Sequence, residues 1–228
     1  MSGTSFTRPL RFVGALILLT FVTGLFSVAP AIDSPNYLLE ARGNFDQSIF
    51  AALNQFVLAL IYLAIALVLY PLLASFNKAL TISFLSLRIV ATTLMIMGTL
   101  QLLSILSLSQ NIAQTNPMEL ETLSTLGSIL KTNRDNLNHV FMVLVLATSN
   151  LLLYYLLYVS KCIPKWLSIS GFLASVLSIL ASILLLFQVY DVISSAYLIL
   201  NAPTALVELT LASGLLFAIF SKSVKAKG

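Results

Sequence analysis

The sequence predicts an all-α, polytopic integral membrane protein, in which residues 1–228 form a single domain of six transmembrane helices. Of the 228 residues, 59% are hydrophobic and 9% are charged, whereas a soluble domain carries about 25% charged residues. A chain with so little polar surface requires a bilayer as its partner. Its apolar residues also gather into runs of about 20 or more, and each run is long enough for one crossing.

The six spans are separated by polar segments and turn signals. The first span follows two arginines, a layout shared with secretory signals, but Pro30 would follow the cleavage site and block it, so we expect a retained helix. The second ends at Tyr70-Pro71, an interfacial aromatic and a helix stop. The approximate spans are residues 12–31, 48–73, 79–106, 140–160, 167–190 and 201–220.

Two segments do not fit a simple alternation of spans and loops. Residues about 117–131 mix spaced apolar side chains with Glu119, Glu121 and Lys131, a pattern typical of a short amphipathic helix at the membrane interface. The last apolar stretch, 192–220, is too long for one straight crossing. Asn201-Ala202-Pro203 divides it, so we expect 192–200 to be re-entrant or interfacial.

The cations predict the orientation of the bundle in the cell membrane. With six spans and a cytoplasmic N-terminus, the inner segments hold eight cations and the outer segments hold three, with Arg88 as the twelfth. The positive-inside rule therefore favours cytoplasmic N- and C-termini. The inner cations are Arg8, Arg11, Lys78, Lys161, Lys165, Lys222, Lys225 and Lys227, and the outer ones are Arg42, Lys131 and Arg134.

Arg88 and Glu208 are the two charged residues that no choice of helix ends places in water. A charge at a helix centre costs roughly 2.5 to 3.5 kcal/mol on insertion scales. Pairing the two inside the bundle lowers that cost, so we expect a buried salt bridge between them. The pair either fixes helix packing alone or faces a ligand or a water-filled path, as intramembrane ionisable groups often do.

Other polar residues are candidates to join this pair. Asn54, Gln55, Asn150 and Asn201 all fall within or beside the spans. Each forms either an interhelical hydrogen bond or a ligand contact. The bias of such residues to the outer half favours a polar pocket that opens outward, with Arg88 and Glu208 at its floor.

His139 follows Asp135 by four residues, so a helix would place both on one face at the outer boundary. They form either a pH-responsive pair or a solvated helix start. One histidine and one cysteine, Cys162, predict no metal site and no internal disulfide. No motif for a cofactor, for a catalytic nucleophile or for nucleic acid is present.

The chain resembles a family of small bacterial multi-spanning membrane proteins, the domain-of-unknown-function family 4386. The resemblance implies the fold and the topology, but no activity, because none is assigned to the family. Members often carry Glu after Arg-Ile-Val, where this chain has Ala91. The matching segments are Tyr70-Pro71, Arg88-Ile89-Val90, Tyr154-Tyr155-Leu156-Leu157-Tyr158, Ile163-Pro164-Lys165-Trp166-Leu167-Ser168 and Pro203-x-x-Leu-x-Glu208.

Three functions compete at this stage. The favoured one is a non-enzymatic membrane protein whose outward-facing pocket binds a small apolar or amphipathic molecule or a lipid, or which serves as an accessory subunit in contact with other membrane subunits or with its own copies. The second is a small transporter or channel for a solute or for protons, favoured by the interruption at Asn201-Ala202-Pro203. A membrane-embedded enzyme acting on lipid is the third, with Glu208 as acid or base.

Overall fold

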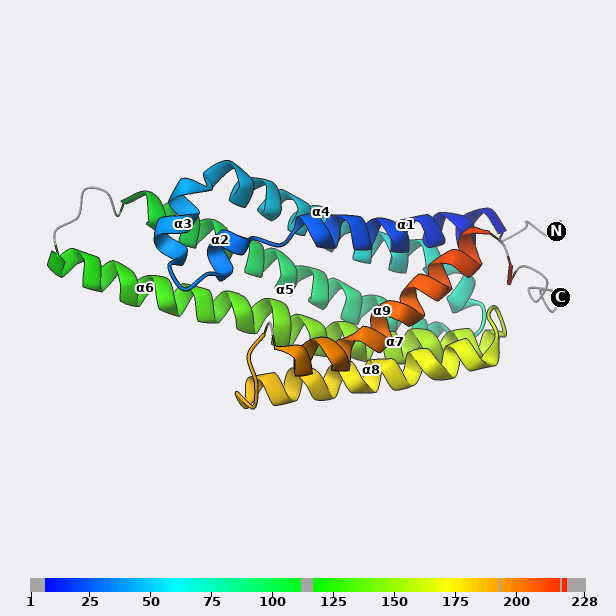
Figure 1. Cartoon of the computed structure of the whole chain (residues 1–228). Helices are drawn as coiled ribbons and strands as arrows, with labels where there is room; N and C mark the ends of the chain where they lie inside the picture. The colour runs from blue at the N-terminus through cyan, green and yellow to red at the C-terminus, as the bar shows by residue number, and fades with distance from the viewer. Residues whose placement is uncertain (1–6, 112–116, 193, 218, 221–228) are drawn as a thin grey trace.

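Six long helical segments run side by side in the computed structural model, which describes residues 7–111, 117–192, 194–217 and 219–220 (Figure 1). Each segment is long and apolar enough to cross a membrane. The predicted all-α, multi-pass bundle is therefore confirmed. The segments are α1 (Thr7–Phe26), α4 (Phe45–Ala74), α5 (Lys78–Asn111), α6 (Pro117–Asp135) continued into α7 (Met142–Ser160), α8 (Lys165–Leu186) and α9 (Ser195–Leu216).

The spans form a closed ring in which each helix packs against the next one along the chain. The contacts run from α1 to α4, α5, α7, α8 and α9, and α9 packs back against α1. This last contact depends on Gly14, where a Cβ atom would lie 2.7 Å from the carbonyl oxygen of Ala212. Only glycine allows two helix backbones to approach so closely. The first and last spans thus close the bundle.

Small residues on α8 let the aromatic core of α7 lie against it. The ring of Tyr154, which is 2% exposed, occupies the space where a side chain on Gly171 would lie. Two turns further along, Ser178 and Thr204 share a hydrogen bond of 2.8 Å between their hydroxyl groups, which joins α8 to α9. Close packing of small residues is the usual basis of helix association in membranes.

Three predicted boundaries differ from the structure. The first span ends at Phe26 rather than at residue 31, because Pro30 begins a separate short helix, α2 (Pro30–Asp33). The second continues through Pro71 to Ala74. In the last, α9 is continuous through Pro203 from Ser195, so the expected division at Asn201-Ala202-Pro203 is absent. Proline is tolerated within membrane helices because neighbouring groups satisfy the freed backbone.

The helix expected at about 117–131 is present, but it is longer and belongs to a continuous helical segment. α6 does not form a separate element but runs through a π-helical segment, η2 (Asn136–Phe141), directly into α7 (Figure 1). No glycine or proline lies between residues 128 and 141 to end it. α6 packs along the far part of α5 and lies near α3 (Tyr37–Gly43), where the Tyr37 hydroxyl donates to the carbonyl oxygen of Ser124 at 3.4 Å.

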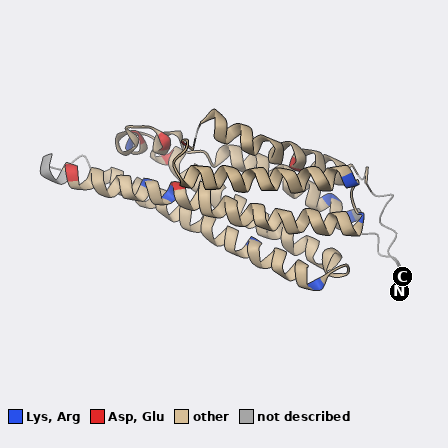
Figure 2. Ribbon diagram, turned by 90° about the horizontal axis from the view of Figure 1, so that it is seen from below, with Lys and Arg blue, Asp and Glu red and all other residues tan. Residues whose placement is uncertain are grey.

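Charge is distributed unequally between the two ends of the bundle (Figure 2). One end, here called the basic end, is where α1 begins and α9 finishes. The other, here called the acidic end, is formed by α2, α3, α6 and the connection after α8. Among described residues, the basic end holds Arg8, Arg11, Lys78, Lys161 and Lys165, and the acidic end holds Asp33, Glu40, Asp46, Glu121, Asp135 and Asp191 together with Arg42, Lys131 and Arg134.

Candidate functional site

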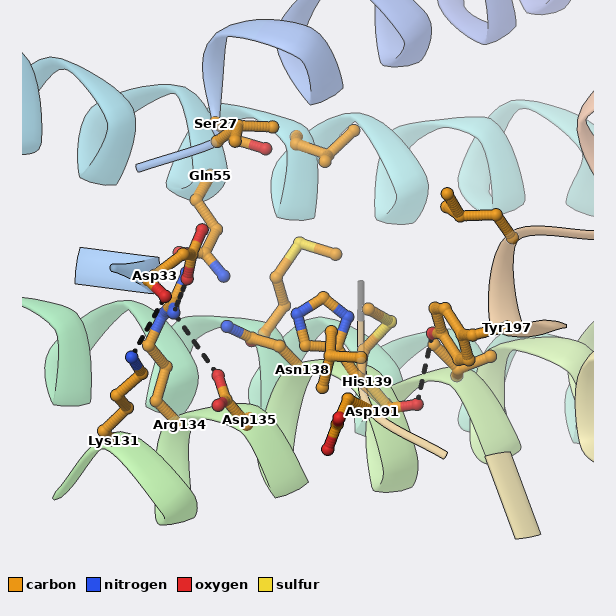
Figure 3. A pocket seen from close by; sticks show the side chains of 17 residues that line it. Ser27, Asp33, Gln55, Lys131, Arg134, Asp135, Asn138, His139, Asp191 and Tyr197 are labelled. Atoms are coloured by element: carbon orange, nitrogen blue, oxygen red, sulfur yellow. Dashed lines mark hydrogen bonds and ion pairs between the residues drawn. The ribbon is translucent and has the colours of Figure 1, made fainter. Parts of the chain in front are cut away.

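A large cavity of about 710 Å³ lies towards the acidic end of the bundle (Figure 3). Side chains from α2, α4, α5, α6, η2, α7, α9 and the connection before α9 meet around it. Its wall combines apolar side chains with many polar ones. The apolar ones are Val28, Leu58, Met95, Met142, Val143, Val192 and Leu198, and the polar ones are Ser27, Asp33, Gln55, Lys131, Arg134, Asp135, Asn138, His139, Asp191 and Tyr197.

The π-helical segment η2 presents Asn138 and His139 to this cavity. A π turn inside a long α-helix is rare and is found frequently at functional sites. Asn138 lies directly over Gly98 of α5, in the space that a side chain there would occupy. The His139 ring meets Tyr197 edge-on, with ring centroids 6.2 Å apart, and the Tyr197 hydroxyl donates to the His139 carbonyl oxygen at 3.5 Å.

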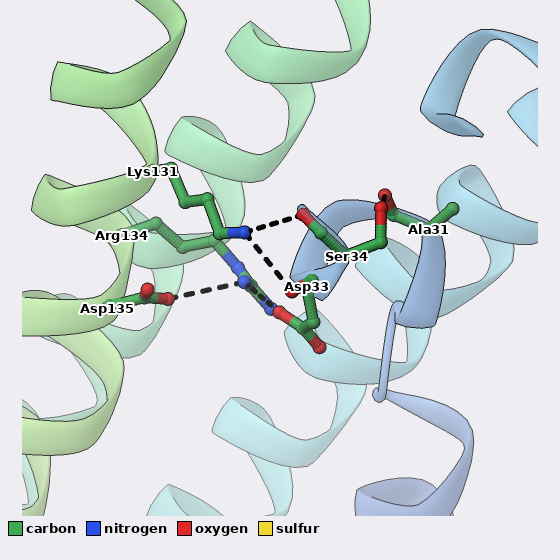
Figure 4. A network of polar contacts seen from close by, with 6 residues as sticks. All are labelled: Ala31, Asp33, Ser34, Lys131, Arg134 and Asp135. Carbon is green, nitrogen blue, oxygen red and sulfur yellow. Dashed lines mark hydrogen bonds and ion pairs between the residues drawn. The ribbon is translucent and has the colours of Figure 1, made fainter. Parts of the chain in front are cut away.

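A network of ion pairs forms the end wall of the large cavity (Figure 4). Arg134 Nη1 lies 2.6 Å from Asp33 Oδ1 and 3.3 Å from Asp135 Oδ1. Lys131 Nζ donates to the carbonyl oxygens of Asp33 at 3.1 Å and Ser34 at 2.9 Å. These contacts join α6 to α2 and fix the part of the long helix that lies at the acidic end.

Three buried polar atoms around the large cavity have no hydrogen-bond partner: Gln55 Oε1, Asn138 Oδ1 and Arg134 Nε. Gln55 is 8% exposed, and Asn138 and Arg134 are each 5% exposed. Figure 3 shows Gln55 extending from α4 towards the opposite wall of the cavity. A buried polar group without a partner costs about 1–3 kcal/mol. Asn138 Oδ1 is directed at Gly98 of α5, so Gln55 Oε1 and Arg134 Nε are the unpartnered atoms left in the described wall of the cavity.

A second polar site, here called the central cluster, surrounds Arg88 in the middle of the bundle. Arg88 is 3% exposed. Its Nε donates to Ser149 Oγ at 3.1 Å, and its Nη2 donates to Asn150 Oδ1. The Asn150 amide in turn donates to Glu208 Oε1 at 3.3 Å. The structure therefore brings Arg88, Asn150 and Glu208 together, and the contact between the two charges passes through Asn150.

The expected direct salt bridge between Arg88 and Glu208 is thus replaced by a relay. Within the described residues, the ion pairs are those of Arg134 with Asp33 and with Asp135. The rings of Tyr62 and Phe84 also lie against the Arg88 guanidinium, with centroids at 5.6 and 5.3 Å. Aromatic faces and neutral amides can accommodate a buried guanidinium where a carboxylate does not reach it.

The sequence suggested that Arg88 and Glu208 form the floor of an outward-facing pocket. In the structure they do not line the large cavity. They line a separate small cavity of about 20 Å³, which has room for a single water molecule. An apolar layer lies between the two cavities, because Leu58, Met95 and Met142 line the large one and pack in one cluster with Tyr62, which lines the small one.

The remaining predicted residues divide between the two sites and the helix surfaces. Gln55, His139 and Asp135 line the large cavity, and the hydrogen-bond partner of Asp135 is Arg134. The amides of Asn54 and Asn201 donate to carbonyl oxygens one turn back in their own helices, those of Phe50 and Tyr197. Neither asparagine lines either cavity.

Sequence reasoning missed most of the polar wall of the large cavity. Lys131 and Arg134 are three residues apart, which places them on one helical face, and this spacing was a usable signal. Asp33, Asn138 and Asp191 come from elements whose meeting depends on the π segment and on the connection before α9. Nothing in the local sequence indicates either feature.

Two tyrosines outside the spans keep their protons and act as donors. Burial raises the pKa of Tyr190, whose hydroxyl donates to the Ala181 carbonyl oxygen at 2.7 Å. Burial also raises the pKa of Tyr37, whose ring lies 4.9 Å from Lys131 Nζ. Both contacts hold the peripheral segments in place around the large cavity.

Comparison with known proteins gives one match over most of the chain. A family model described as "Domain of unknown function (DUF4386)" matches residues 12–218. No curated protein and no solved structure matches the chain. Among the residues that the structure describes, no group of three or more His, Cys, Asp and Glu side chains is arranged to hold a metal ion.

Proposed function

The chain belongs to the DUF4386 family, and from its site we propose that it is a non-enzymatic integral membrane protein that binds a small amphipathic molecule in the large cavity. The observation that carries the proposal is a cavity whose wall includes two side chains with unpartnered buried polar atoms, those of Gln55 and Arg134. In a bundle whose other polar groups are largely satisfied, such a site suits a ligand that supplies the missing partners.

The size and lining of the cavity fit this proposal. Its volume of about 710 Å³ falls within the roughly 300–1,000 Å³ of small-molecule sites. One part of its wall is formed by Leu58, Met95, Met142 and Val143, and another by the charged residues of α2 and α6. A molecule with an apolar body and a polar head would meet a matching surface at both of its ends.

Binding is favoured over catalysis because two of the three acids that line the cavity are already engaged. Asp33 and Asp135 both accept hydrogen bonds from Arg134. Within the described residues, the hydroxyl of Tyr197 is directed to a backbone carbonyl oxygen rather than to a base. Catalysis by a nucleophile requires a neighbouring base within hydrogen-bond reach.

The test is a pair of matched glutamine substitutions. Gln55→Leu removes an unpartnered amide from the cavity and Gln101→Leu removes one elsewhere, since Gln101 Oε1 is also buried without a partner. We expect both variants to be stabilised, each by about 1–3 kcal/mol. Only Gln55→Leu should lose the molecule that co-purifies with the protein, as read by native mass spectrometry. Retention of the same molecule by both variants would contradict the proposal.

We further propose that the basic end faces the cytoplasm and that the large cavity opens on the outer side of the cell membrane. The basic end holds five of the described cations and the acidic end three, and the positive-inside rule assigns the end with more cations to the cytoplasm. Single cysteines in place of Asp46 and of Lys78, in a Cys162→Ser background, would test this in intact cells. An impermeant maleimide should label the first and not the second; the reverse pattern would invert the topology.

Transport is the second candidate function, and the stacking of the two cavities favours it. On α5, Met95 lines the large cavity and Arg88 lines the small one, seven residues or about 10 Å closer to the basic end. A solute leaving the large cavity inward would therefore meet a buried charge. Proteoliposomes that show no flux under pH and ion gradients, from protein that binds its ligand, would remove this candidate.

A further inference from the structure

We propose that the molecule bound in the large cavity carries an ammonium head group. The inference deepens the proposed function and rests on it. Three acids from three separate elements line the cavity, namely Asp33 from α2, Asp135 from α6 and Asp191 from the connection before α9. Two cations face them, Lys131 and Arg134, so the wall carries one negative charge in excess.

Both cations are already committed to the protein. Arg134 lies between two carboxylates, those of Asp33 and Asp135. Lys131 Nζ donates to two backbone carbonyl oxygens and lies 4.9 Å from the centre of the Tyr37 ring. Arg134 Nε remains without a partner, but an anionic head group beside it would also lie against the carboxylates of Asp33 and Asp135, whose negative charge repels it.

Asp191, by contrast, is exposed and forms no ion pair with the described residues. Its backbone carbonyl oxygen accepts from Ser194, but no described residue donates to its carboxylate. It thus supplies the uncompensated charge at the wall of the cavity. A cation beside it would gain the attraction of an ion pair without breaking an existing one.

Hydrogen-bond chemistry gives an independent indication of the same head group. Of the unpartnered buried atoms at the cavity, Gln55 Oε1 is an acceptor and Arg134 Nε a donor, whereas Asn138 Oδ1 is directed at Gly98 of α5. The Gln55 oxygen accepts and cannot donate, so its missing partner is a donor. An ammonium group carries up to three N–H donors and a positive charge, and it therefore meets both requirements at once.

The experiment compares four amphiphiles with the same ten-carbon chain: decylamine, decyltrimethylammonium, decanol and decanoate. Each is titrated into the purified full-length protein in detergent, and binding is read by the shift in thermal unfolding and by native mass spectrometry. We expect decylamine to bind at least tenfold more tightly than decanol or decanoate. The quaternary cation should bind more weakly than decylamine, because it has no N–H to donate.

Two matched charge variants place the effect at the cavity. Asp191→Asn should weaken decylamine by about fivefold, the scale of an exposed ion pair, and this loss should shrink as salt is added. Asp46→Asn removes the same charge at the same end but outside the cavity, and it should leave every affinity unchanged. Both residues are exposed, so neither substitution threatens folding.

The outcomes separate this inference from the proposed function. If none of the four amphiphiles binds, the proposed function fails and the inference fails with it. If decanol or decanoate binds as tightly as decylamine, the cavity is a binding site but the ammonium head group is overturned. Equal losses in Asp191→Asn and Asp46→Asn would also overturn it, since the preference would then arise from the surface as a whole.

Discussion

The relay through Asn150 predicts an unusual order of stabilities among variants of the central cluster. Replacing Asn150 by Ala removes the acceptor for Arg88 Nη2 and the donor to Glu208 at once. Interhelical hydrogen bonds in membranes reach about 1.7 kcal/mol each, and bonds to charged groups in water-soluble proteins about 1.5–3 kcal/mol. Losing two such bonds should therefore lower the free energy of unfolding by about 3 kcal/mol.

Glu208→Gln should cost much less. The amide oxygen of Gln can still accept from Asn150, so only the charged character of one hydrogen bond is lost, about 1 kcal/mol. If Arg88 and Glu208 formed a direct ion pair, the same substitution would leave Arg88 buried without its partner and cost about 3–5 kcal/mol. The two geometries thus differ in which variant is the more damaging.

Reversible unfolding in mixed micelles of dodecyl maltoside and dodecyl sulfate, followed by circular dichroism, provides the measurement. Asn54→Ala is the matched control, because the Asn54 amide donates only to Phe50 of its own helix, and its cost should stay below about 0.5 kcal/mol. A Glu208→Gln protein that is less stable than Asn150→Ala would refute the relay. Equal effects of Asn150→Ala and Asn54→Ala would refute it as well.

Three further predictions concern packing and reactivity. Gly171→Ala should destabilise the bundle by about 1–3 kcal/mol, because the new methyl group would overlap the Tyr154 ring; unchanged stability in micelles would contradict that contact. Gly24→Ala meets no atom within 4 Å and should be neutral or stabilise by up to about 1 kcal/mol in the same assay. Burial raises the pKa of Cys162, so maleimide labelling of its thiol in detergent at pH 7 should be slow. The labelling rate should rise with pH as the thiolate forms, and labelling should become fast on unfolding. Equal rates in folded and unfolded protein would count against a buried thiol.

The fold was largely predictable because bilayer thickness and backbone hydrogen bonding leave few alternatives for long apolar runs. The errors fell where tertiary contacts override local signals. Pro203 predicted an interruption of the last span, yet α9 is continuous on both sides of it. The pattern over 117–131 predicted a short, separate helix at the interface, whereas α6 continues through η2 into α7, with Lys131 and Arg134 bound to α2.

The candidate site was predictable only in part, for a related reason. The cost of burying Arg88 and Glu208 identified them as inward-facing, and Asn150 was recognised as polar within a span. Which groups touch depends on helix rotation, which hydropathy does not determine. The lining of the large cavity is harder to predict, because the π segment changes the face that the long helix presents to the bundle at Asn138. No residue type in the sequence marks that change.

The hydrogen-bond partners of Arg88 are synthesised after it, so the order of translation determines when each contact can form. Its partners Ser149 and Asn150 follow it by 61 and 62 positions, a delay of roughly 3 to 12 s at the usual rate of translation. Glu208 emerges 58 positions later again. For that interval the nascent chain holds a guanidinium in the membrane with no carboxylate to neutralise it. The Ser149 hydroxyl and the Asn150 amide are synthesised first and accept hydrogen bonds from the Arg88 guanidinium. Glu208 is synthesised last and then accepts from Asn150.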